Sequence, residues 1–80
     1  LNLMDNELKT VPETIGRLTR LTFLNLSLNP IEDIPESISN LRELERLGLH
    51  GKNGELSPNF TKEEQKLLEE LLPNCKITFE

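Results

Sequence analysis

The chain has 80 residues, of which 35% are hydrophobic and 29% are charged, so it is expected to form one small folded domain without a membrane span. Its net charge of −5 argues against nucleic acid as the main ligand, because binding to a phosphate backbone rests on clustered lysine and arginine. A single cysteine excludes an internal disulfide framework.

Residues of the same kind recur along the chain at a fixed spacing of 23 positions. The recurring sets are Leu1, Leu24 and Leu47; Asn6 and Asn29; Pro12 and Pro35; Ile15 and Ile38; and Leu18 and Leu41. A period of about 20 to 50 residues is typical of arrays in which each unit buries its apolar face against the next. The sequence therefore predicts a solenoid whose function lies on an extended surface.

Each period begins with a predicted short strand. In the second copy, Leu24 and Leu26 alternate with Asn25, which places both leucines on the buried face. Phe23, Asn25 and Ser27 are then expected on the opposite face, exposed to solvent. Equivalent strands would pair in parallel about 4.8 Å apart, so that residues one period apart become lateral neighbours.

Each predicted strand is followed by an asparagine and then by a proline. We interpret Asn6 and Asn29 as structural turn residues, because an amide side chain can bond backbone groups that have left the strand ladder. Pro12 and Pro35 restrict the backbone, so the return segment is expected to be extended or loosely wound before the next isoleucine turns inward.

The middle copy, LTFLNLSLNPIEDIPESISNL at residues 21–41, fits the pattern L-x-x-L-x-L-x-x-N-x-I-x-x-I-P-x-x-I-x-x-L. The first copy enters this pattern late, and the third departs from it where Lys52 replaces the asparagine and Asn53 follows. With these motifs the chain resembles a leucine-rich repeat protein of the 23-residue class. The resemblance implies an α/β solenoid with short parallel strands on a concave face and a convex return side.

The pattern changes in the last third of the chain. Residues 1–56 are predicted to hold about three repeats, and residues 57–80 a C-terminal cap made of a helix and a strand. The segment TKEEQKLLEELLPNCKITF resembles the cap of bacterial leucine-rich repeat proteins. That resemblance points to a bacterial protein, and a secreted or cell-surface location stays open beside an intracellular one.

Local signals support the helix and the strand of this segment. Thr61 and Glu64 have the spacing of a capping box, and the leucines that follow form one apolar face of a helix before Pro73. Beyond it, Cys75 and Ile77 alternate with polar residues, which predicts a final strand.

The chain begins within a repeat. Leu1 already occupies a strand position, without a Met, a signal peptide or a cap before it, so we expect a C-terminal fragment of a longer array. A first strand with a free edge would also favour self-association.

Outward positions of the predicted strands have no part in the core, and the resemblance implies that such concave positions contact protein ligands. The expected partner-binding residues are Asn2, Met4, Phe23, Asn25, Ser27, Leu28, Arg46 and His50. Phe23 beside Arg46 would combine an aromatic ring with a guanidinium, a composition favoured at interface hot spots. Alternatively, Phe23 only stacks on Arg46 and shields the sheet.

The sequence offers no convincing catalytic or metal site. Ser27 and His50 fall on neighbouring strands, but Asp5 lies beyond Ser27, and no nucleophile elbow or oxyanion hole accompanies them. One histidine and one cysteine do not supply a metal ligand set, and no glycine-rich phosphate loop occurs. We therefore predict no enzyme activity, cofactor or metal.

The resulting prediction is a module that binds a protein partner on its concave sheet. Two alternatives remain open at this point. The array could be purely structural, as a spacer or a self-associating element, or it could target an enzyme domain elsewhere in a longer protein.

Overall fold

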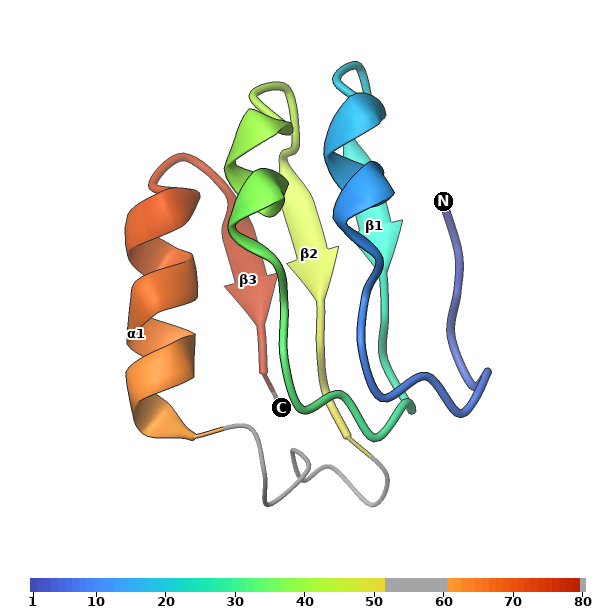
Figure 1. Cartoon of the computed structure of the whole chain (residues 1–80). Helices are drawn as coiled ribbons and strands as arrows, with labels where there is room; N and C mark the ends of the chain where they lie inside the picture. The colour runs from blue at the N-terminus through green and yellow to red at the C-terminus, as the bar shows by residue number, and fades with distance from the viewer. Residues whose placement is uncertain (52–60, 80) are drawn as a thin grey trace.

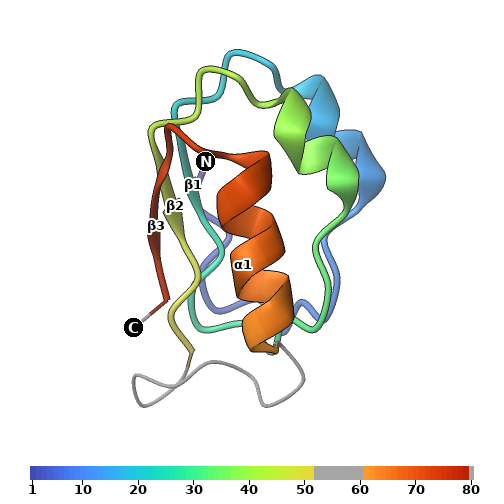
Figure 2. The ribbon, with the colours of Figure 1, turned by 90° about the vertical axis from the view of Figure 1, so that its left-hand side faces the viewer.

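A computed structural model of the chain describes residues 1–51 and 61–79. In this part of the chain, three parallel strands form one sheet in the order β1-β2-β3, with helices on one side of it (Figure 1). The elements are η1 (Glu13–Arg17), β1 (Phe23–Asn25), η2 (Glu36–Asn40), β2 (Arg46–Gly48), α1 (Lys62–Leu71) and β3 (Lys76–Thr78). Figure 2 shows the sheet as one layer and the helices as the other, which is an α/β arrangement.

The strands pair with a different sequence offset on the two sides of β2. Leu24 in β1 is opposite Leu47, which is the predicted spacing of 23 residues. Leu47 is in turn opposite Ile77 in β3, which is 30 residues further along the chain. Before β1, residues 1–5 continue the sheet, because the Leu3 N–H donates to the Asn25 carbonyl at 2.8 Å.

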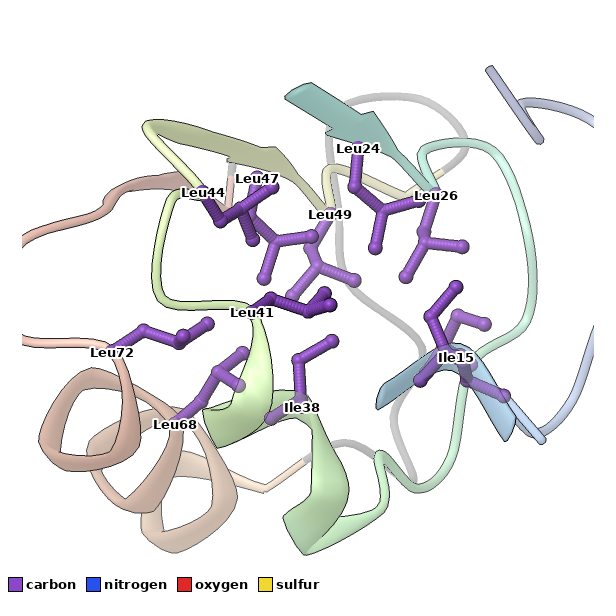
Figure 3. Close-up of a cluster of buried hydrophobic side chains, with 12 residues drawn as sticks. Ile15, Leu24, Leu26, Ile38, Leu41, Leu44, Leu47, Leu49, Leu68 and Leu72 are labelled. Carbon is purple, nitrogen blue, oxygen red and sulfur yellow. The ribbon is translucent and has the colours of Figure 1, made fainter. Parts of the chain in front are cut away.

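The core lies between the sheet and the helices (Figure 3). Leu24 and Leu26 are 0% and 1% exposed, which confirms the predicted inward direction of these two residues. The described residues that complete the buried cluster are Val11, Ile15, Ile31, Ile38, Leu41, Leu44, Leu47, Leu49, Leu68 and Leu72. Burying a side chain of this size contributes about 1.5–3 kcal/mol, so the inward positions hold the units together.

The return segments are more regular than the sequence indicated. Pro12 and Pro35 are extended, with φ of −65° and −68°, and each is followed directly by a 3-10 helix. The first turn closes where the Ile15 N–H donates to the Pro12 carbonyl, at 3.0 Å. Proline fixes φ but leaves the following residues free, so the wound part could not be read from the proline alone.

The two 3-10 helices approach each other closely at Gly16. A Cβ atom at this position would lie 2.6 Å from the Ser37 carbonyl oxygen and 2.9 Å from the Ser37 Cβ. The Ser37 hydroxyl also donates to the Glu13 carbonyl at 2.8 Å, which links η2 to η1. The spacing of successive return segments therefore depends on the absence of a side chain at Gly16.

The predicted C-terminal helix and strand are both present. Helix α1 begins after Thr61, whose hydroxyl accepts a hydrogen bond from the Glu64 N–H at 3.3 Å, and it ends before Pro73. No helix among the described residues is long and apolar enough to cross a membrane. The irregular turn expected at Lys52 and Asn53, and the expected boundary between residues 56 and 57, lie outside the described residues.

Candidate functional site

The face of the sheet opposite the helices carries rows of side chains whose neighbours are fixed by strand register. In the first row, Phe23 of β1 is opposite Arg46 of β2, and Arg46 is opposite Lys76 of β3. Neighbouring strands lie about 4.8 Å apart, so the three side chains emerge side by side. All three are exposed, and Phe23 leaves 44% of its surface open to solvent. We call these residues the Phe23–Arg46–Lys76 row.

The two cations of this row are not engaged by the described part of the chain. Within residues 1–51 and 61–79, no hydrogen bond or ion pair occupies the Arg46 guanidinium or the Lys76 ammonium group. Both groups are therefore available to a ligand without first breaking an internal contact there.

The second row is uncharged and partly occupied by its own backbone. It consists of Asn2, Asn25, Gly48 and Thr78. The Asn25 Oδ1 accepts from the Ser27 N–H at 3.0 Å, and the Asn2 Oδ1 accepts from the Met4 N–H at the same distance. The Asn25 Nδ2 also lies 3.8 Å from the Met4 Sδ. These two asparagines thus support the ends of their own strands.

Beyond the second row lie Met4, Ser27 and His50, and here the sequence expectation needs a correction. Met4 is 40% exposed, His50 is half-buried, and Ser27 is only 1% exposed. The Ser27 Oγ lies 3.1 Å from the point where a Cβ of Gly48 would stand, so the serine fills the space that glycine leaves. The prediction that Ser27 is available to a partner is therefore wrong, because neighbouring groups cover it.

Leu28 has an unusual backbone conformation. Its φ is 59°, in the left-handed region that costs a side-chain-bearing residue about 1–2 kcal/mol. Asp5, one period earlier, has nearly the same φ of 58°, so the conformation belongs to the turn and not to leucine. The Leu28 side chain is half-buried, which leaves less of it for a partner than the sequence suggested.

The turn residue Asn29 is 6% exposed, and its amide group is fully used. Its Oδ1 accepts from the N–H groups of Asn6 at 2.7 Å and Leu8 at 3.0 Å. Its Nδ2 donates to the carbonyls of Leu3 at 2.8 Å, Leu26 at 3.0 Å and Ser27 at 3.2 Å. One side chain therefore joins two consecutive turns of the chain, whereas the exposed Asn6 amide reaches only carbonyls in its own turn.

The described residues form no arrangement suited to nucleophilic or metal chemistry. The Ser27 Oγ has no hydrogen-bond partner there, so Ser27 and His50 do not form a nucleophile and base pair. No group of three or more potential metal ligands is found in the same part of the chain. Burial raises the pKa of the Cys75 thiol, which favours the unreactive protonated form at neutral pH.

Sequence reasoning missed Lys76 as a member of the outward surface. Alternation around Ile77 already placed Lys76 on the outward side of the last strand, but the repeat period did not place it beside Arg46. The offset between β2 and β3 is 30 residues instead of 23, so only the strand register brings the two cations together.

Residues 1–54 match a family model described as leucine rich repeat. The matched region includes η1, β1, η2 and β2, and thus both Phe23 and Arg46, and it stops before α1 and β3. No curated protein matches the chain.

Proposed function

The chain belongs to the leucine-rich repeat family, and from this premise we propose that it binds a protein partner on the outward face of its sheet, without catalysis. Members of this family generally mediate protein–protein interaction. In this proposal the outward face is the concave side of a solenoid, and the Phe23–Arg46–Lys76 row supplies the principal contacts.

The single observation that carries the proposal is the exposure of Phe23 beside Arg46. An aromatic ring that leaves 44% of its surface in water adds little to stability, whereas the opposite face of the same strand buries Leu24 completely. Aromatic and arginine side chains are enriched among residues that dominate binding energy. A spacer has no need of such a pair on its surface.

The C-terminal segment supports the proposal by completing the array. We propose that residues 57–80 form its cap, because α1 lies beside η2 in a place comparable to that of a further return segment (Figure 1). Leu68 and Leu72 enter the common core from this segment, and β3 extends the sheet beyond β2. Lys76 then contributes to the binding face from outside the repeats.

A photo-crosslinking residue in place of Thr78 tests the location of the binding face. Thr78 is exposed in the second row, and its replacement leaves Phe23 and Arg46 unchanged. The matched control carries the same residue in place of the exposed Glu36 in η2, on the return side.

With lysate of the source cells, we expect one defined protein to be captured from Thr78 and not from Glu36. Capture should be lost when Phe23→Ser and Arg46→Ser are added. Equal labelling from both positions, or capture of nothing but a second copy of the chain, would favour the structural or self-associating array instead.

A further inference from the structure

We infer that the partner offers an acidic segment to this sheet, with carboxylates that pair with Arg46 and Lys76 next to an apolar side chain on Phe23. The inference rests on the proposed function and adds the chemistry of the partner. It follows from the charge distribution, the strand register and the absence of competing groups on the outward face.

The charge of the outward face differs in sign from that of the whole chain. The sequence has 14 acidic and nine basic residues, yet the outward positions of β1, β2 and β3 hold two basic residues and no acidic one. These outward positions are Phe23, Asn25, Arg46, Gly48, Lys76 and Thr78. A cationic face on an anionic protein attracts acidic partners and repels further copies of the anionic chain.

The register makes the two cations a like-charged pair. Arg46 and Lys76 are directly opposite each other in a parallel ladder, and like charges in such positions destabilise a sheet. Since the described residues provide no counter-charge for either group, the repulsion remains in the free protein. A carboxylate placed between the two side chains would remove it and form ion pairs with both.

The surroundings of the pair leave room for such a ligand. The second row beside it is uncharged, and Gly48 and Thr78 are small, so no carboxylate there competes for the cations. Glu45 precedes β2 and is exposed, which makes it the nearest acidic residue in the sequence to Arg46. Phe23 closes the row on the β1 side with apolar surface.

Two cations are too few to favour a nucleic acid. Binding to a phosphate backbone gains strength from the release of many counterions and requires correspondingly many contacts. A short acidic stretch of a protein with a neighbouring leucine or phenylalanine fits this surface better, because it satisfies both cations and the exposed ring.

The test uses the full chain, labelled with ¹⁵N, and three synthetic peptides that share their leucine and phenylalanine positions. The remaining positions are glutamate in the first peptide, glutamine in the second and lysine in the third, and an oligothymidylate of similar length serves as a further anion. We expect the glutamate peptide to bind most tightly, to lose affinity with added salt, and to shift amide signals of β1, β2 and β3.

Charge reversal supplies the matched comparison. The variant Arg46→Glu with Lys76→Glu should weaken the glutamate peptide by about tenfold or more and should improve binding of the lysine peptide. The control, Arg42→Glu with Lys66→Glu, changes net charge equally at exposed positions outside the strands and should alter affinity by less than about twofold. The amide spectrum verifies that each variant is folded, and Arg46→Ser with Lys76→Ser replaces the reversal if it is not.

Several outcomes would overturn the inference. They are equal binding of the glutamate and lysine peptides, equal loss in the control, absence of glutamate-peptide binding at millimolar concentration, or preference for the oligothymidylate. A protein captured at Thr78 whose binding is insensitive to the Arg46 and Lys76 reversal would also overturn it, while leaving the proposed function intact.

Discussion

The two faces of the sheet are built from the same strands but follow different rules. On the inner face, Leu24 and Leu47 are identical residues in identical environments, 0% and 1% exposed. On the outer face, the corresponding row changes from Phe23 to Arg46 to Lys76. Inner positions must repeat because every unit packs on its neighbours, whereas outer positions are free to differ and can carry recognition.

The largest expected effect separates the two faces directly. Leu47→Ala leaves a cavity among buried leucines and should lower the free energy of unfolding by about 2–5 kcal/mol. Phe23→Ser, on the outer face of the adjacent strand, should lower it by less than about 1 kcal/mol. Urea unfolding followed by circular dichroism measures both. Similar losses in the two variants would mean that Phe23 serves the sheet and not a partner.

The next effect concerns the turn that joins consecutive units. Asn29→Ala removes five hydrogen bonds and leaves buried backbone groups without partners, so a loss of about 2–4 kcal/mol is expected. Asn6→Ala is the control, because the Asn6 amide is exposed and water can replace its bonds. Hydrogen exchange should accelerate at the Asn6 and Leu8 amides in Asn29→Ala. Unchanged protection there would show that the turn holds without the Asn29 side chain.

A third comparison uses two glycines, one in each layer. At Gly16 an added Cβ would lie 2.6 Å from a backbone oxygen of Ser37, and Gly16→Ala should cost about 1–3 kcal/mol by pushing η1 and η2 apart. At Gly48 the nearest atoms belong to the side chains of Asn25 and Ser27, at 3.0 Å and 3.1 Å, and these can move. Gly48→Ala should therefore cost less in the same urea assay, and a reversed order would contradict this view of the return side.

Prediction from the sequence succeeded where positions repeat. The inward leucines of β1 and β2 occur at a constant period, and α1 shows its own cap at Thr61 and a stop at Pro73, so local patterns were sufficient. Lys76 could not be placed beside Arg46 in this way, because the 30-residue offset to β3 is set by how α1 and the final strand pack.

Ser27 failed for a different reason, and it yields the smallest prediction. Alternation gives the direction of a side chain but not what covers it, and Ser27 is enclosed by side chains from neighbouring positions. Its Oγ is buried without a hydrogen-bond partner among the described residues, which costs free energy that an alanine would not cost. Ser27→Ala should therefore raise the free energy of unfolding by about 1 kcal/mol.

The same substitution sharpens the comparison of the two faces through Gly48. Because the Ser27 Oγ is one of the two atoms that an added Cβ at Gly48 would meet, Gly48→Ala should cost less in the Ser27→Ala background than alone. A double-mutant cycle in urea measures this coupling. Exact additivity would show that the Asn25 side chain alone limits Gly48, and a loss of stability in Ser27→Ala would show that the hydroxyl is satisfied in solution. Either result would change the account of why one outward position of this sheet is closed while Phe23, Arg46 and Lys76 stay open.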